Sequence, residues 1–535
     1  MPLQDLASAP QPISNARAQF CIVGAGMAGL FVARKLARAG HSVVVLESGG
    51  LAHDEATHQL NDIIHPDQLY TRALTGRFRG LGGSSQRWGG RMIPIDVHDM
   101  GPRPHLQLEG WPFDAGELEI HTQEIETVFA LPHGSYGGDV AGRMGLAGKF
   151  AQDDPDFSSR WPKWIDIRRC NLGTLWRHEL EQLPQLSIWL GATVTDFAVD
   201  RASGRLLAVK AGNFNGRTVS VEAERFVIAA GTIESTRLLL WLNEQTDGHA
   251  FADCAVLGRY FQDHLKAEVA TIERSDAVLS NELFGYHYLD ATRRSLHLDL
   301  TPQAQQEDGV TSAFVYAAMD LSRNDGLARI KRVARGVQSR QQRLADAVGL
   351  FGDIGLLART AYWRLWRQQI YMPANVPLRI QVAIEQMPDR DNRIALAPER
   401  DRLGLPRALL HWRPTDADEK TFRAAMGRLD RYWRRNGLTG NCPLAWDAMA
   451  EGERVIDRSH GYAHPSGSTR MGTDPRHSVV DADLACHAVP NLSIASASTF
   501  PTSGSANPTL TILKVALRLA DTLLAEATRP ASQAA

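Results

Sequence analysis

Near the N-terminus, hydrophobic positions form two short runs separated by a stretch with helical spacing. The runs are Phe20–Val23 and Ser42–Leu46, and each is typical of a buried parallel strand. Between them, apolar residues recur on one face of a helix, at Leu30, Ala33, Leu36 and Ala37. The pattern predicts a strand, a helix and a second strand in succession.

Further along the chain, apolar runs predict four more strands. Two are expected at Thr193–Val199 and Arg225–Ala230, and two at Leu378–Glu385 and Asn392–Leu396. A last helical pattern runs from Asn507 to about Leu524, with core-facing residues expected at Leu510, Leu513, Leu517 and Leu524. No internal repeat interrupts these elements.

Composition narrows the class of protein. Of 535 residues, 44% are hydrophobic, so the chain can bury a large core, and a net charge of -2 argues against nucleic-acid binding. No apolar run is long enough to cross a membrane, and no secretory signal is visible. The five cysteines are scattered singly, which predicts no metal site and favours the cytoplasm.

The first strand–helix junction carries a glycine motif, Gly24-Ala-Gly26-Met27-Ala28-Gly29, and Glu47 ends the second strand. Gly24 permits a tight turn, Gly26 allows backbone to approach a pyrophosphate, and Gly29 allows close helix–strand packing. The helix N-terminus favours the anion, and Glu47 can accept hydrogen bonds from ribose hydroxyls. The motif predicts ADP-ribose binding without separating NAD from FAD.

The C-terminal helix supplies a second candidate anion site. Asn507 is a favoured N-cap and Pro508 a favoured first helical residue, so the helix is expected to start there. Its positive end would suit the negative charge of a reduced flavin. The alternative reading is that Asn507 is only a cap.

At these residues the chain resembles the glucose–methanol–choline (GMC) family of FAD-dependent alcohol oxidoreductases. The resemblance rests on the block His464-Pro-Ser-Gly-Ser-Thr-Arg-Met-Gly472 and on the ending Asn507-Pro-Thr-Leu-Thr511. Ser468 replaces the usual Thr of the first block. Between the two ends of the chain, further family blocks follow in order, at Arg79–Ser85, Gly110–Pro112, Ala230–Ser235 and Gly258–His264.

The resemblance implies a mixed α/β fold with a discontinuous, Rossmann-like FAD-binding domain. This domain would comprise residues 18–265, with an inserted segment at about 101–190, and residues 456–526. Residues 266–455 would form a substrate domain, with a mostly antiparallel sheet backed by helices. The resemblance spans roughly residues 18–526, but no motif within 266–455 identifies the substrate.

The resemblance also implies the site residues. His464 would accept the alcohol proton while a hydride moves from carbon to flavin N5, and Asn507 would hydrogen-bond the same oxygen. A neutral imidazole is a competent base near pH 7. The implied FAD-binding residues are Gly24, Gly26, Met27, Ala28, Gly29, Glu47, Gly82, Gly83, Ser84, Ser85, Trp88, Val194, Ala230, Gly231, Ser498, Pro508 and Thr509.

Several positions depart from the common family pattern or have an uncertain role. Trp88 stands where many members carry Asn, and it resembles the pyranose oxidase and gluconate dehydrogenase branch. In the pyranose oxidases, a histidine that precedes this Trp bonds covalently to FAD. Arg87 stands at that position here, and a guanidinium is not a flavin nucleophile. We therefore expect FAD to bind without a covalent bond. His264 is interpreted as structural rather than as a second base, and Glu234 as part of a strand-to-helix turn.

A basic segment lies outside the common core. Residues 323–367 contain ten basic and three acidic side chains, with Leu327, Ile330, Val333 and Val337 on one helical face. Residues 322–370 are therefore expected to form a basic helical insert. Three roles stay open for it: a lid or solvated face, peripheral contact with an anionic membrane, and docking of a protein partner.

The leading functional hypothesis is FAD-dependent oxidation of a CH–OH group in a sugar, glycoside or polyol. O2 or another acceptor would reoxidise the flavin. The alternatives are oxidation of a lipophilic alcohol or sterol, a flavin-binding subunit without turnover, and an NAD-dependent enzyme.

Overall fold

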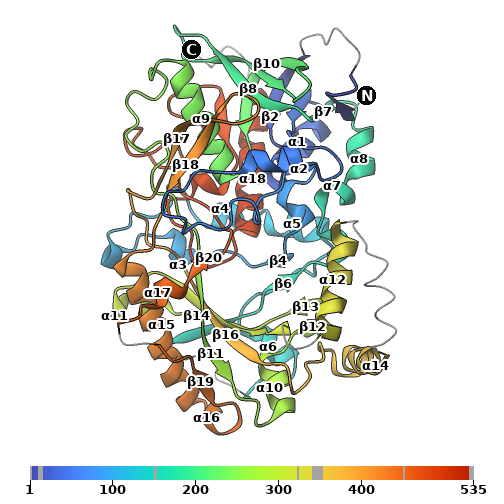
Figure 1. Cartoon of the computed structure of the whole chain (residues 1–535), viewed down its shortest axis with the longest axis vertical. Coiled ribbons are helices and arrows are strands. Elements are labelled where there is room, and N and C mark those ends of the chain that lie inside the picture. The colour runs from blue at the N-terminus through green and yellow to red at the C-terminus, as the bar shows by residue number, and fades with distance from the viewer. Residues whose placement is uncertain are drawn as a thin grey trace.

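Two large sheets, one above the other in Figure 1, divide the molecule into two halves. The computed structural model describes residues 3–9, 16–149, 154–321, 325–339, 354–449 and 452–528. Each sheet has its own cluster of buried hydrophobic side chains. This mixed α/β architecture agrees with the fold class predicted from the sequence.

The upper sheet has the strand order β1-β7-β3-β2-β10-β9-β8, with β21 paired to β10. Six of its strands run parallel to one another, namely β1, β7, β3, β2, β10 and β21. Strands β9 and β8 are added in antiparallel orientation. The bounds are Leu3–Asp5 (β1), Ala16–Val23 (β2), Val43–Leu46 (β3), Leu186–Leu190 (β7), Thr193–Val199 (β8), Leu206–Gly212 (β9), Thr218–Ile228 (β10) and Leu492–Ile494 (β21).

Helix α1, Met27–Arg38, connects β2 to β3 and confirms the predicted strand–helix–strand unit. All four predicted core-facing residues, from Leu30 to Ala37, are buried. Helix α18, Thr509–Thr528, packs against α1 beside the same sheet (Figure 1). It begins one residue later than expected, and Leu510, Leu513 and Leu517 are buried, whereas Leu524 is partly buried.

The lower sheet is antiparallel throughout, as expected for the predicted substrate domain. Its order is β19-β11-β16-β15-β14-β5, with β20 paired to β11. Helix α15, Asp416–Arg435, packs against β15 and β16. The strand bounds are Phe157–Arg160 (β5), Leu265–Ile272 (β11), His297–Leu300 (β14), Ala313–Met319 (β15), Leu378–Ile384 (β16), Leu444–Trp446 (β19) and His460–Gly461 (β20).

Two smaller sheets complete the strands. One has the order β12-β13-β6-β4, with bounds His287–Leu289, Thr292–Arg294, Lys163–Trp164 and Arg91–Met92. The other pairs β17, Arg393–Arg400, with β18, Pro406–His411. β16 and β17 are close to the strands predicted at 378–385 and 392–396.

The remaining helices lie around the sheets. Helix α9, Thr232–Gln245, follows β10 directly. The others are α2 (Glu55–His58), α3 (Val97–Met100), α4 (Gly116–Glu119), α5 (Thr122–Val128), α6 (Asp139–Arg143), α7 (Leu172–Leu175), α8 (Arg177–Gln182), α10 (Ala277–Phe284), α11 (Pro302–Asp308), α16 (Leu438–Asn441) and α17 (Val455–Arg458).

The basic insert is helical where it is described, as α12 (Asp325–Ser339) and α14 (Ile354–Tyr362), followed by a π-helical turn at Trp363–Arg367. Residues 322–324 and 340–353 of the predicted insert, and the side chain of Val337, lie outside the described part. Leu365 and Trp366 are exposed. Among the described residues, no helix combines the length and hydrophobicity needed to cross a bilayer.

Candidate active site

A cavity of about 1440 Å³ connects the ends of the parallel strands with the C-terminal motifs. Val23 and Gly24, at the end of β2, and Leu46 and Glu47, at the end of β3, lie in its wall. His464 and Asn507 also lie in this wall. The carboxyl edge of a parallel sheet is where α/β proteins commonly bind ligands. One cavity thus contains both the dinucleotide motif and the predicted catalytic pair.

The glycine turn before α1 is built for close approach of backbone. Gly24 has φ +106°, which a side chain would strain. A Cβ on Gly29 would lie 2.0 Å from the Gly24 carbonyl oxygen, so helix and turn touch here. Gly26 has no atom nearer than 4.0 Å to its added Cβ and faces the cavity. The α1 N-terminus has no side-chain cap, so its N–H groups are open to an anion.

Glu47 holds this turn in place through its carboxylate. The carboxylate accepts hydrogen bonds from the backbone N–H groups of Ala25 (2.8 Å), Gly49 (2.8 Å) and Gly80 (2.9 Å). Burial raises the pKa of Glu47, against the opposing effect of these N–H donors. The residue predicted to bind ribose therefore also joins the glycine turn to the loop at Gly80.

The other predicted FAD-binding residues fall into two groups. Those in the cavity wall are Met27, Ala28, Gly83, Ser84, Trp88, Val194, Ala230, Gly231, Pro508 and Thr509. Those outside the wall are Gly29, Gly82, Ser85 and Ser498. Ser85 and Ser498 are buried and bonded internally, since Ser85 Oγ donates to the Gly82 carbonyl and Ser498 Oγ accepts from Thr469. The hydroxyl groups of Ser85 and Ser498 are therefore engaged within the protein.

Glu234 lies in the first turn of α9, as the expected strand-to-helix turn requires. It forms ion pairs with Arg79 (3.1 Å) and Arg237 (2.8 Å). These arginines overcome the effect of burial and lower the pKa of Glu234 to about 2. The pair with Arg79 connects α9 to the loop that precedes Gly80.

His464 and Asn507 face each other across the cavity wall. Asn507 Nδ2 lies 3.2 Å from His464 Nε2. Asn507 Oδ1 is buried and has no hydrogen-bond partner among the described residues. The expected side-chain cap of α18 is therefore not formed, because the amide is turned toward His464. This geometry disfavours the reading of Asn507 as only a cap.

His264 fixes the tautomer of His464. His264 Nε2 lies 2.7 Å from the Gly504 carbonyl oxygen, and its Nδ1 lies 2.9 Å from His464 Nδ1. A carbonyl can only accept, so Nε2 of His264 carries the proton and its Nδ1 has the lone pair. His464 Nδ1 must then donate, which leaves the lone pair of His464 on Nε2, facing Asn507.

Asp263 holds the backbone of the same loop. Its carboxylate accepts a hydrogen bond from His464 N–H at 2.7 Å, next to Ala463, which has φ +62°. Burial raises the pKa of Asp263 to about 7. Asp263 therefore positions the backbone of His464, and His264 positions its ring. The sequence analysis interpreted His264 as structural without identifying His464 as its partner.

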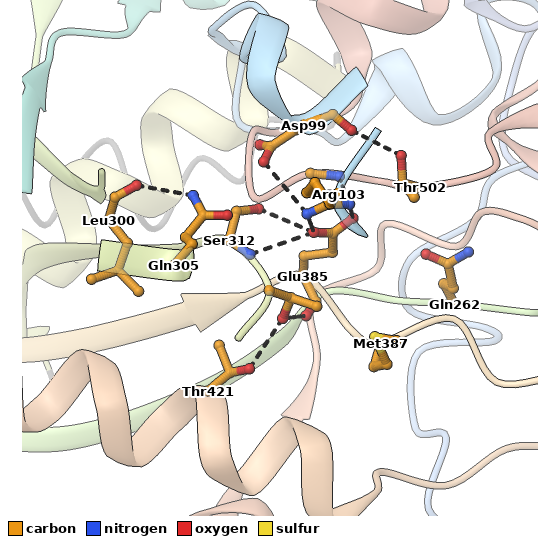
Figure 2. Close-up of polar contacts among 12 residues, drawn as sticks. Asp99, Arg103, Gln262, Leu300, Gln305, Ser312, Glu385, Met387, Thr421 and Thr502 are labelled. Carbon is orange, nitrogen blue, oxygen red and sulfur yellow. Dashed lines mark hydrogen bonds and ion pairs between the residues drawn. The ribbon is translucent and has the colours of Figure 1, made fainter. Parts of the chain in front are cut away.

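Asp99, Arg103 and Glu385 form a buried ionic network (Figure 2), which holds the backbone N–H of Gly504. Arg103 pairs with both carboxylate oxygens of Glu385, at 2.5 and 2.9 Å, and Glu385 accepts the Gly504 N–H at 3.0 Å. Asp99 lies 3.6 Å from Arg103. Burial raises the pKa of Asp99 to about 8, and Glu385 acts in the same direction, although Arg103 opposes them. The network anchors the loop on which His264 depends.

Both histidines are held neutral. Burial lowers the pKa of His264 to about 4. Burial also holds the pKa of His464 well below its usual value, and His264, Arg91 and Lys266 act in the same direction. At neutral pH, His464 is therefore in the unprotonated form that a general base requires.

Sequence reasoning missed the side chains that line the cavity beyond His464. They are Arg91, Trp164, Lys266, Tyr286, Arg293, Tyr316 and Tyr462. They come from five strands and two loops and form no local motif. Only Arg91, three residues after Trp88, and Tyr462, two residues before His464, lie beside a recognised block.

The cavity fits FAD on three observations from these residues. A glycine turn and an uncapped helix N-terminus face it at one end. Asn507 Oδ1 is an orphaned acceptor at the other end. The volume exceeds the several hundred Å³ typical of small-ligand sites, leaving room for a dinucleotide and a substrate.

Comparison with known proteins agrees with this geometry. A family profile described as GMC oxidoreductase matches residues 388–516, and one described as FAD dependent oxidoreductase matches residues 19–110. The chain is 23% identical to 6'''-hydroxyparomomycin C oxidase from Streptomyces lividus, over 93% of this chain and 90% of the relative. It is 24% identical to the fructose dehydrogenase large subunit from Gluconobacter japonicus, over 95% and 98%.

Solved structures share the fold. A formate oxidase superposes with a TM-score of 0.58 at 15% identity, covering 96% of this chain and 99% of that one. Pyridoxine 4-oxidase from Mesorbium loti gives a TM-score of 0.58 at 16% identity, covering 94% and 99%. The two profiles match the segments that build the glycine turn and the His464–Asn507 pair. The chain thus combines a GMC oxidoreductase C-terminal domain with an FAD-dependent oxidoreductase domain, and it is an FAD-dependent enzyme that acts on CH–OH donors.

Proposed function

We propose that this enzyme oxidises a hydroxyl-bearing carbon of a sugar, glycoside or polyol to a carbonyl, with His464 as the base. The observation that carries the proposal is the His264–His464–Asn507 chain, which directs a lone pair on His464 Nε2 into the cavity. The names of the paromomycin-type oxidase and the fructose dehydrogenase subunit support a carbohydrate donor.

The two polar groups suit one substrate oxygen. A hydroxyl placed between them can donate its proton to His464 Nε2 and accept a hydrogen bond from Asn507 Nδ2–H. Bound FAD would supply the hydride acceptor for this chemistry. The neutral state of His464, set by burial and by nearby cations, makes the base available before the hydroxyl arrives.

We further propose that FAD binds without a covalent bond. Arg87 stands where a covalent histidine occurs in pyranose oxidases, and its guanidinium lies over the Phe78 ring at 4.5 Å. An unfolded, acid-precipitated sample would then release all of its flavin into the supernatant. Flavin remaining with the precipitated protein would contradict the proposal.

The alcohol-oxidation proposal is tested with His464→Ala. General acid–base catalysis contributes about 10²- to 10⁴-fold, so anaerobic flavin reduction by a sugar or polyol should slow by that factor. The variant should keep its FAD absorption band, because the glycine turn is distant in sequence and intact. His477→Ala is a matched control, since His477 is an exposed histidine paired with Asp474. Reduction at the wild-type rate in His464→Ala would overturn the assigned base.

The remaining alternatives give different results in the same assay. A flavin-binding subunit without turnover would keep a yellow band that no alcohol bleaches. Oxidation of a lipophilic alcohol or sterol would show bleaching by long-chain donors and not by sugars. The predicted membrane or partner contact of residues 323–367 stays a prediction.

A further inference from the structure

Two arginines flank one tryptophan in the small sheet β12-β13-β6-β4. Arg91 on β4 and Arg293 on β13 both stand directly opposite Trp164 on β6. The guanidinium carbons lie 5.0 Å (Arg91) and 4.0 Å (Arg293) from the Trp164 ring centroid. All three residues line the cavity. Side chains in register across neighbouring strands share one face of a sheet, so this row is fixed by the backbone.

The row is connected to the catalytic pair through Tyr462. Arg91 Nη2 donates to Tyr462 Oη at 2.9 Å, and the Tyr462 and His464 rings are 4.8 Å apart. Lys266, on β11, places its Nζ 4.9 Å from the centre of the Tyr462 ring. Three cations are therefore grouped beside His464, away in sequence from the glycine turn that suits the pyrophosphate.

None of these cations forms a salt bridge within the described part of the chain. The Arg91 hydrogen bonds go to neutral partners, Tyr462 and His297. Arg293 makes only aromatic contacts, with Trp164 and Tyr286, and the Nε atoms of both arginines are buried without a partner. Lys266 Nζ lies over the Tyr462 ring, and Glu268 acts on its charge without forming an ion pair with it among the described residues. Uncompensated, desolvated cations are costly, so such a cluster calls for a counter-charge.

The carboxylates around the cavity are already engaged elsewhere. Asp166 pairs with Arg168, Asp290 with Arg143 and Glu234 with Arg237. Glu47 accepts three backbone N–H groups. Glu268, the acid nearest to Lys266 along β11, pairs with Arg379. Among the described residues, the cavity wall therefore contains no carboxylate that forms an ion pair with these three cations.

We propose that the substrate itself carries an oxyanion, a carboxylate or a phosphate ester, which Arg91, Arg293 and Lys266 bind while a hydroxyl of the same molecule faces His464. A guanidinium matches a carboxylate or phosphate in shape and charge. A sugar acid or a sugar phosphate satisfies both ends of the site. The inference rests on the proposed alcohol oxidation and specifies its donor class.

The charge of Arg91 acts on its neighbours in a way that supports this assignment. Burial lowers the pKa values of Arg293, Lys266 and His464, and Arg91 acts in the same direction on all three, whereas, despite burial, neighbouring tyrosines raise the pKa of Arg91 itself. Binding of an oxyanion removes these repulsions together. It also raises the basicity of His464 when substrate is present, which favours proton transfer from the hydroxyl.

The test measures binding separately from oxidation. FAD-loaded enzyme whose flavin has first been reduced with dithionite, and which therefore cannot oxidise a donor, is titrated anaerobically by calorimetry with D-gluconate and with sorbitol, which share a carbon skeleton and differ in charge. A second pair, glucose 6-phosphate and glucose, distinguishes phosphate from carboxylate. We expect the preferred anion to bind at least tenfold more tightly than its neutral partner, as a charge-assisted hydrogen bond predicts.

The variants locate this preference. Arg293→Gln should reduce the ratio of anion to neutral affinity by roughly 10- to 100-fold, and Arg293→Lys should restore part of it. Arg423→Gln is the matched control, because Arg423 lies on α15, outside the cavity wall, and pairs with Glu419. Equal affinity for both members of each pair, or an equal effect of Arg293→Gln and Arg423→Gln, would overturn the inference. Anion binding that depends on Arg293 but never bleaches the flavin would instead refute the proposed oxidation and leave the anion site standing.

Discussion

The two ends of the cavity are lined by different parts of the protein, one by backbone groups and the other by side chains. The nucleotide end consists of backbone: a glycine turn, the N-terminus of α1, and N–H groups organised by Glu47. The substrate end consists of long side chains, such as Arg91, Trp164 and Arg293, brought together from separate strands. Backbone geometry specifies a constant ligand with few residue types, whereas side chains can change the substrate without altering the fold.

The His464 loop lies where these two ends meet. Its backbone is held by Asp263 and its ring by His264, while the Gly504 loop is held by Glu385, which directly follows β16 of the lower sheet. The proposed catalytic pair is thus positioned by both halves of the molecule. Three predictions, in decreasing size of effect, test the nucleotide end, the His464 junction and the ionic network below it.

The largest effect should come from the glycine turn. Gly29→Ala places a Cβ 2.0 Å from a backbone oxygen, so α1 must shift and FAD binding should be lost. Gly26→Ala meets no protein atom closer than 4.0 Å, and its φ of -74° suits alanine. Its methyl group enters the cavity, so the fold should persist while the FAD dissociation constant rises by roughly 10- to 100-fold.

The measurements are flavin absorbance after gel filtration, and FAD titration of apoprotein. Gly142→Ala is the control, since Gly142 lies in α6 with open space around its added Cβ. It should retain FAD like wild type. Full FAD occupancy in Gly29→Ala would show that the nucleotide end tolerates side chains and would remove the contrast between the two ends.

The second effect concerns His264. His264→Ala removes the acceptor for His464 Nδ1–H, so His464 can adopt the tautomer with its proton on Nε2, which is not a base toward the substrate. We expect kcat to fall by roughly 10- to 100-fold, within the usual contribution of a general base, with little change in KM. His264→Gln keeps one amide donor and one acceptor and should recover part of the rate.

The pH profile separates this positioning role from general destabilisation. Because the pKa of His464 is held well below its usual value, the wild-type rate should be flat from pH 8 to pH 6.5 and fall only at lower pH. Removing His264 removes one group that lowers this pKa, so the decline should begin at higher pH. The same profile in His264→Ala and wild type, with kcat unchanged, would contradict the tautomer argument.

The sequence predicts the structure of the nucleotide end of the cavity better than that of the other end. Residues 20–47 predict their strand–helix–strand unit correctly, because the apolar spacing and glycine chemistry are local. His464 and Asn507 are recognisable from their motifs, but the partnership of His264 with Gly504 depends on a contact 240 residues apart along the chain. Arg91 and Arg293 meet at Trp164 only through strand register, which no periodicity in the sequence encodes.

The smallest effect concerns the ionic network between the two halves. The pKa of Asp99 is raised to about 8 by burial, well above the value of about 4 in an unfolded chain. Between these values the native state holds a proton that the unfolded state releases. The free energy of unfolding should therefore fall as pH rises through this window, by at most about 1.4 kcal/mol per pH unit.

Asp99→Asn removes this titration, so the variant should gain stability relative to wild type as pH rises from 5 to 8. Urea unfolding at several pH values measures the difference, and Asp416→Asn, at an exposed residue paired with Arg454, is the control without such a trend. A stability difference that is constant with pH would mean that Asp99 is ionised beside Glu385. Arg103 would then serve two carboxylates rather than one, and its hold on Glu385 and the Gly504 loop would be weaker than the bidentate geometry implies.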